Sequence, residues 1–103
     1  MGEAEQTVKD VTILNQAVDT TEVGVAIPNV CLAVSIQCRT NVDINWSLTE
    51  TEADPGDGDL YQTIKGNTEL FIDRMYLKGR VIYLYAPSSV VVEIVFHLAA
   101  KES

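Results

Sequence analysis

The stretch Val30-Cys31-Leu32-Ala33-Val34-Ser35-Ile36-Gln37-Cys38 decides the fold class, because every second position from Val30 onward carries an apolar side chain. Successive side chains of a β-strand point to opposite faces, so a period of two predicts a strand with one buried face. The same period recurs over residues 42–48 and 90–98. These three stretches indicate a protein built from β-strands.

Further strands are expected at residues 8–18, 22–27, 60–65, 69–73, 75–78 and 80–86. Glycine, proline and asparagine mark the breaks between them, which is typical of turns. Turns at intervals of roughly 8–12 residues are characteristic of a sandwich or barrel. We therefore predict an all-β fold, an antiparallel β-sandwich of jelly-roll or immunoglobulin-like form with about eight strands.

The length of 103 residues fits one domain. Residues 1–7 are polar and predict a flexible N-terminal arm, and residues 8–103 predict a single sandwich domain. A domain of this size buries roughly two thirds of the surface that its unfolded chain exposes, so association with further subunits would add stability. We expect a homo-oligomer, either a trimer or a dimer.

The net charge of −8, from fifteen acidic and seven basic residues, argues against several classes of partner. Binding to nucleic acid or to an anionic membrane surface needs clustered Lys and Arg, and the basic residues here are scattered along the chain. The acidic N-terminus lacks the pattern of a signal peptide, and no apolar run reaches the length of a membrane helix. We expect synthesis in the cytoplasm.

Cys31 and Cys38 lie seven positions apart. On one regular strand they would point to opposite faces and sit about 23 Å apart. A disulfide requires Cα atoms within about 7 Å, so we expect two free thiols that act as small buried or half-buried side chains. The same separation argues against a cysteine metal site.

Catalytic motifs are absent from the sequence. The single histidine, His97, shares strand parity with Val91, Glu93 and Val95, opposite the apolar row of the last strand. No G-x-S-x-G elbow, phosphate-binding loop or H-E-x-x-H motif accompanies it. We predict that the chain is not an enzyme, that it holds no cofactor, and that His97 is a surface or interface imidazole.

One long acidic loop spans residues 49–59 and is expected to be exposed. Asp54, Asp57 and Asp59 alternate with Gly and Pro, as calcium ligands often do, but their spacing differs from that of an EF-hand. We interpret the loop as a solvated turn and predict no metal site. Calcium binding by the loop is the alternative. Pro55-Gly56 suggests a type II turn with Gly56 at positive φ.

Trp46 and the pair Tyr83 and Tyr85 are the aromatic residues considered for the core or for binding. Trp46 shares the parity of Ile44 and is expected in the core. Tyr83 and Tyr85 are expected in the core or at a subunit interface, because Tyr favours strands and is enriched at interfaces. The alternative is that exposed rings form a stacking platform for sugars, as in a carbohydrate-binding module.

The last strand carries apolar residues on both faces, broken by Glu93. Such a strand is either central in a sandwich or covered by another subunit, since as an open edge it would promote aggregation. The residues expected at a subunit or capsid interface share this strand or the tyrosine pair: Val91, Glu93, Val95, His97, Tyr83 and Tyr85.

Residues 30–98 resemble small structural proteins that tailed phages encode near their head genes. The resemblance is carried by the strand Cys31–Cys38 and the strand that follows its turn, residues 42–46. It continues in Gly66-Asn67-Thr68-Glu69-Leu70-Phe71-Ile72, and in the turn of residues 75–79 with the apolar strand of residues 81–85. The chain differs from that pattern in the strand after Pro87 and in the acidic loop.

The resemblance implies a capsid decoration, or cement, protein on the outer surface of the phage head. Such a protein binds neighbouring subunits of the major capsid protein and so stabilises the assembled shell. The arm 1–7 and the strand 90–98 would make the contact. A neck, tail or baseplate protein of the virion is the first alternative, and a carbohydrate-binding module is the second.

Overall fold

The computed structural model describes residues 8–73 and 79–99, and it places eight β-strands and no helix in them. The all-β prediction is confirmed. The predicted arm 1–7 and the predicted strand 75–78 lie outside the described residues. The strands are β1 (Val8–Val18), β2 (Val23–Ala26), β3 (Cys31–Cys38), β4 (Ile44–Ser47), β5 (Gln62–Ile64), β6 (Glu69–Ile72), β7 (Val81–Tyr85) and β8 (Val90–Ala99).

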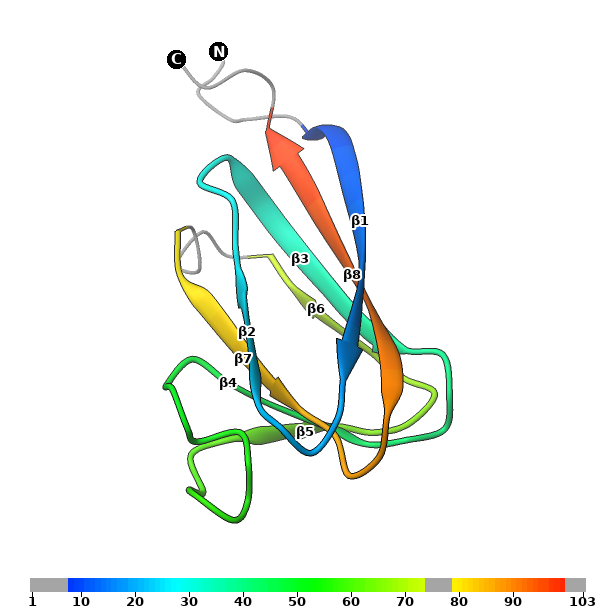
Figure 1. Ribbon diagram of the computed structural model, residues 1–103. Coiled ribbons are helices and arrows are strands. Elements are labelled where there is room, and N and C mark those ends of the chain that lie inside the picture. Colours follow the sequence, from blue (N-terminus) through cyan, green and yellow to red (C-terminus); the bar gives the residue numbers. More distant parts are fainter. Residues whose placement is uncertain (1–7, 74–78, 100–103) are drawn as a thin grey trace.

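The strands form two four-stranded antiparallel sheets that pack face to face (Figure 1). Sheet A has the order β1-β8-β3-β6 and sheet B the order β2-β7-β4-β5. The first strand therefore pairs with the last, the second with the seventh, the third with the sixth and the fourth with the fifth. Every pair of neighbouring strands thus joins one strand from β1–β4 with one from β5–β8, and most neighbours are distant in sequence.

The core lies between the sheets and follows the predicted period of two. In β8, Val92, Ile94 and Phe96 point inward and are buried, while the residues between them face outward. Sheet B contributes the same pattern through Ile82 and Leu84 of β7. The side chains that are less than 2% exposed and largest are aliphatic: Ile36, Ile44, Ile82, Leu84 and Ile94.

Cys31 and Cys38 are free and buried, and both belong to the same core cluster. The prediction that they point to opposite faces is wrong. The pairing of β3 with β8 shifts between Cys31 and Ala33, where two residues of β3 advance against one of β8. Such a bulge reverses the parity of every residue before it, so Cys31 joins the core row. Burial raises the pKa of the Cys31 thiol above its ordinary value.

The acidic loop 49–59 packs on the domain, contrary to the expectation that all of it is exposed. Ala53 is fully buried, and its carbonyl accepts a hydrogen bond of 3.1 Å from Asn45 Nδ2 on β4. The carboxylate of Glu22 accepts from the N–H groups of Thr51 and Ala53 at 2.7 and 3.0 Å. Glu52 accepts from two further N–H groups at the end of the loop, at 3.0 and 3.1 Å. The carboxylates of Glu22 and Glu52 therefore serve as hydrogen-bond acceptors for backbone N–H groups in and beside the loop.

The turn at Pro55-Gly56 closes with a hydrogen bond of 2.9 Å from Asp57 N to the carbonyl of Asp54. Gly56 does not adopt positive φ, so the predicted type II turn is wrong. The Asp54 carboxylate accepts the Gly56 N–H at 2.8 Å, which stabilises the local bend through a side chain. Among the described residues, those at positive φ are Thr51, Asn67 and Gly79.

Asp43 ties the loop before β4 to the turn after β5. Its carboxylate accepts the Gly66 N–H at 2.8 Å and the Lys65 ammonium at 3.1 Å. The Gly66 hydrogen bond, followed by that from Lys65, lowers the pKa of Asp43 below its ordinary value. The charged form of Asp43 is therefore favoured in the folded state.

Asp43→Asn should reduce stability at neutral pH and flatten the acid limb of the stability curve. A carboxyl whose pKa is lower in the folded state stabilises the folded protein at pH values above its unfolded-state pKa. This stabilisation disappears as the pH falls through the folded-state pKa. The difference in urea midpoint between the two proteins should therefore be present at pH 6 and shrink steadily below pH ~4. Asp57→Asn is the control, since its carboxylate accepts no hydrogen bond within the described residues. A difference that stays constant with pH would contradict this assignment.

Candidate functional site

The outer face of sheet A carries an apolar patch whose residues come from β1, β8 and β6 and which extends across all four strands. Across one row of the sheet, Ile13 of β1 lies beside Val95 of β8, then Ser35 of β3 and Phe71 of β6. In the next row Val11 lies beside His97. We call the surface made by Val11, Ile13, Phe71, Val95 and His97 the outer patch.

Three large apolar side chains of the outer patch are exposed to solvent. Ile13 is 59%, Phe71 54% and Val11 46% exposed. Isolated exposed apolar residues are normal, but a contiguous group of them marks an interaction surface. The patch ends at a polar row of Asn15, Glu93, Gln37 and Glu69.

The structure places four of the predicted interface residues on this face. Val95 and His97 belong to the outer patch, Glu93 lies in the polar row, and Val91, which is 52% exposed, lies beyond that row. Glu93 forms an ion pair with Arg39 at the end of β3, and its side chain is 16% exposed. The sequence reasoning missed Val11, Ile13 and Phe71, because the sequence does not show that β1 lies beside β8 or that β6 lies beside β3.

His97 is held by two neighbours at the centre of the outer patch. Its Nε2 lies 3.1 Å from the Ser35 hydroxyl, and its ring meets the edge of Phe71 with centroids 5.8 Å apart. Ser35 is only 6% exposed, and no carboxylate contacts the imidazole among the residues described. The pair thus lacks the third group that orients a base for nucleophilic catalysis, and it fixes the imidazole within the patch.

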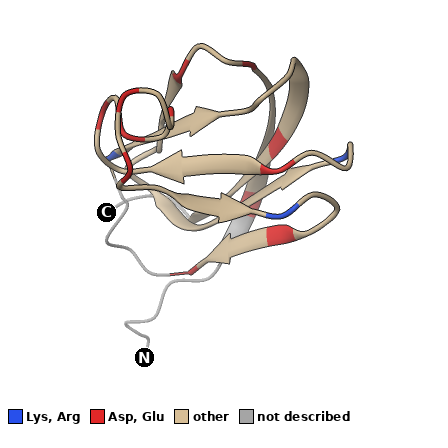
Figure 2. Cartoon of the chain, turned by 90° about the horizontal axis from the view of Figure 1, so that it is seen from below, with Lys and Arg blue, Asp and Glu red and all other residues tan. Residues whose placement is uncertain are grey.

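The outer face of sheet B differs because the chain's own loop covers part of it. Ser47 is buried there, donating to the Leu60 carbonyl at 2.7 Å and accepting from Thr49 N at 3.0 Å. The acidic loop continues over Asn45 to the buried Ala53. In Figure 2 the acidic residues gather in the curled loops on the left, whereas most residues of the strands are neither acidic nor basic.

Tyr83 and Tyr85 lie on sheet B and are half-buried. They are therefore not brought together with the predicted interface residues of β8. Tyr83 pairs with Gly24 of β2, and a Cβ at that glycine would lie 3.0 Å from the Tyr83 ring. The ring packs over its own sheet, where the absence of a side chain at Gly24 makes room for it.

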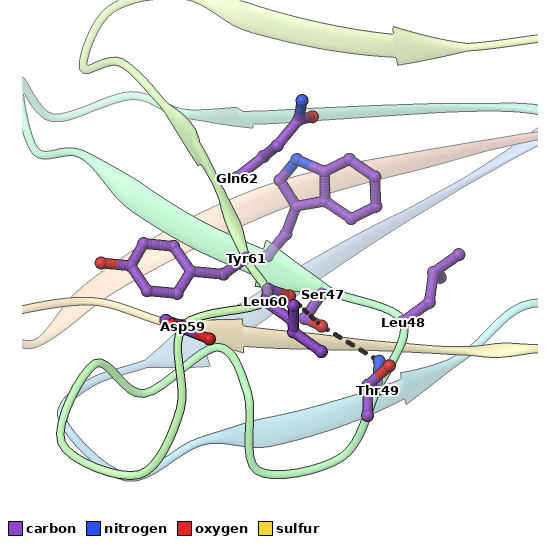
Figure 3. A pocket seen from close by; sticks show the side chains of 8 residues that line it. Ser47, Leu48, Thr49, Asp59, Leu60, Tyr61 and Gln62 are labelled. Carbon is purple, nitrogen blue, oxygen red and sulfur yellow. Dashed lines mark hydrogen bonds between the residues drawn. The ribbon is translucent and has the colours of Figure 1, made fainter.

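A pocket of about 440 Å³ opens where β4 ends and β5 begins (Figure 3). Trp46, predicted to fill the core, is only partly buried against it and lines this pocket. The other lining residues come from both sides of the long loop: Ser47, Leu48, Thr49, Asp59, Leu60, Tyr61 and Gln62. The volume is in the range of sites that hold a small ligand.

The acidic residues do not assemble into a metal site within residues 8–73 and 79–99, where no group of three or more His, Cys, Asp or Glu is placed to hold an ion. The part of the chain that the structure describes also contains no helix capable of spanning a membrane. No model of a known protein family matches the chain, and no curated protein or solved structure matches it.

Proposed function

We propose that the chain is a protein-docking module whose outer patch binds another protein, and that this module decorates a phage capsid. The observation that carries the proposal is the contrast between the two outer faces. Sheet B is partly covered by the loop that packs on Asn45 and Ser47, while no described residue covers Ile13 or Phe71 on sheet A. An exposed apolar sheet face of this kind is stabilised by burial against a partner.

The winding of the strands supports the virion assignment. Pairing of the first strand with the last, and of each inner pair in turn, is the arrangement expected of a jelly roll, a form common in viral capsid and lectin domains. We infer the jelly-roll form rather than the immunoglobulin-like one. The resemblance of residues 30–98 to phage head accessory proteins agrees with it, and the major capsid protein is the partner we propose.

Sedimentation with phage heads tests this function. Tail-less heads that lack the chain, prepared from the virus encoding it, should bind the purified protein and carry it into the pellet. The melting temperature of the heads should rise, since a ligand that binds only the assembled shell stabilises it. Binding to isolated tails or baseplates but not to heads would favour the neck, tail or baseplate alternative. Binding to neither would contradict a virion role.

A second candidate function is saccharide binding in the pocket at Trp46. Sugar rings stack their C–H faces on aromatic side chains, and polar groups at the rim fix their orientation. The pocket offers Trp46 and Tyr61 as aromatic surfaces and places Asp59 and Gln62 beside them as hydrogen-bonding groups. This position differs from the tyrosine pair on β7 that the sequence suggested as a sugar platform.

A glycan array combined with tryptophan fluorescence tests the second candidate. Trp46 is the only tryptophan, so a bound sugar should change the emission directly. Tyr61→Ala should weaken binding of a glycan hit about tenfold or more, the loss expected for one aromatic contact of ~1.4 kcal/mol. Tyr83→Ala on the outer face of sheet B is the matched control and should bind normally. A silent array would remove this candidate.

A further inference from the structure

Among the strands that the structure describes, β1 has the longest open edge. In sheet A only β1 and β6 are edge strands, and β1 has eleven residues against four in β6. An edge strand presents a row of backbone N–H and C=O groups that can pair with another strand. Within residues 8–73 and 79–99, no strand pairs with this side of β1.

The register shows which backbone groups face outward. In an antiparallel ladder the N–H and C=O of one residue point to the same side, and the side alternates along the strand. Ala99 N donates to the Val30 carbonyl, so the odd-numbered residues of β8 face β3 and the even-numbered ones face β1. Even-numbered residues of β8 pair with even-numbered residues of β1. The odd-numbered residues of β1 therefore face the open edge.

Two side chains occupy the ends of this open edge. Asp10 Oδ1 accepts the N–H of Val11 at 2.8 Å, and Gln16 Nε2 donates to the carbonyl of Ala17 at 3.0 Å. The two backbone groups that these side chains cap belong to odd-numbered residues, Val11 and Ala17, in agreement with the register. Within residues 8–73 and 79–99, no side chain or strand caps the Val11 carbonyl, the Ala17 N–H, or either backbone group of Ile13 and Asn15.

We propose that a second copy of this chain pairs with that edge, β1 against β1, antiparallel about a two-fold axis at Leu14. In this register Ile13 lies opposite Asn15 of the second copy, and their uncapped groups form two hydrogen bonds on each side of the axis. The uncapped N–H of Ala17 meets the uncapped carbonyl of Val11, and the two capped groups meet each other. In this register every uncapped group meets an uncapped group, and every capped group meets a capped one.

Neighbouring registers lack this match. Pairing Ile13 with its own copy sets the capped Val11 N–H against the uncapped Asn15 carbonyl. Pairing Asn15 with its own copy sets the uncapped Ile13 N–H against the capped Ala17 carbonyl. The pattern of caps therefore selects one register, and it selects a strand of the same sequence as the partner.

The side chains are compatible with this register. Leu14 lies directly opposite its own copy, and Ile13, which is 59% exposed, lies diagonal to its own copy on the outer face. Asp10 lies opposite Val18, so the negative charges of the two copies stay apart. The joined sheet places the outer patches of the two copies on one continuous face, with the two Ile13 side chains nearest to the axis.

Sedimentation equilibrium and cysteine cross-linking test the proposal on the full chain. The mass should rise with concentration from 11.3 kDa toward twice that value. Leu14→Cys should form a disulfide-linked dimer on mild oxidation, because the two sulfurs lie directly opposite. Thr12→Cys, on the same face, is the matched control, since its copies lie about 13 Å apart along the strand. The native cysteines are buried and leave the background low.

Asn15→Pro gives an independent readout. It removes an N–H that faces the open edge and leaves the ladder with β8 intact, so a folded monomer is expected. The dissociation constant of the dimer should rise at least about tenfold, because two hydrogen bonds are lost per dimer. A mass of one chain at every concentration would overturn the proposal. Equal cross-linking of both cysteine variants, or unchanged affinity of the proline variant, would overturn it as well.

Discussion

Ile94→Ala should lower the free energy of unfolding by about 2–5 kcal/mol, the range measured for truncation of a fully buried isoleucine. Ile94 is 0% exposed and lies in β8, between β1 and β3. The lost methyl groups leave a cavity that the neighbouring strands cannot close, because each is held by its own ladder. Urea denaturation followed by circular dichroism measures the change.

Val91→Ala is the matched control for Ile94→Ala. It lies on the same strand but on the opposite face, and it is 52% exposed. Its truncation should change the free energy of unfolding by no more than about 0.5 kcal/mol in the isolated chain. Equal losses at the two positions would mean that the inward and outward faces of β8 are assigned wrongly.

Gly66→Ala should cost about 1–3 kcal/mol, although alanine ordinarily stabilises a loop glycine. A Cβ at this position would lie 2.7 Å from the backbone of Asn41 and Val42. These are backbone atoms, so the clash is relieved only by moving the loop before β4. That movement also disturbs the hydrogen bond from Gly66 N to Asp43.

Gly56→Ala is the control for Gly66→Ala. The nearest atom to a Cβ there is the Asp54 carboxylate oxygen at 3.3 Å, at the end of an adjustable side chain. The residue is exposed and has no positive φ, so the change should be within about 0.5 kcal/mol of zero. A melting temperature that falls by the same amount for both variants would contradict a specific close approach at Gly66.

The strands were predictable from the sequence because most of them bury only one face against the core. In β8 the inward row Val92, Ile94 and Phe96 alternates with outward residues as expected. The parity argument failed at Cys31, since a bulge depends on how β3 meets β8 and leaves no mark in the sequence of β3 itself. Period-two reasoning is reliable only between bulges.

The loop 49–59 shows a different limit of sequence reasoning. Its acidic composition suggested solvation or a metal, and the structure uses the carboxylates of Glu22 and Glu52 to accept backbone N–H groups. Glu22 is distant in the sequence from the residues it holds. Only the folded arrangement shows that Ala53 is covered and that the loop shields part of sheet B.

The candidate surfaces were only partly predictable. Val95 and His97 could be assigned to an outward face from the parity of one strand. Their neighbours Ile13 and Phe71 required knowledge of the strand order, which a single sequence does not provide. The pocket at Trp46 was missed because its lining joins two ends of a loop.

Substitution within the outer patch tests the central claim, that the patch is the docking surface, most directly. Phe71→Asp places a charge within the patch, at the ring that contacts His97, and leaves the β1 edge untouched. Leu60→Asp, at a residue 65% exposed, places the same charge at the pocket. The measurement is the affinity of each variant for phage heads, with circular dichroism to verify folding. We predict that Phe71→Asp weakens binding about 30-fold or more, as for an aromatic residue that carries ≥ ~2 kcal/mol, and that Leu60→Asp binds like the unmodified chain. Unchanged binding by Phe71→Asp, or a loss confined to Leu60→Asp, would contradict the account.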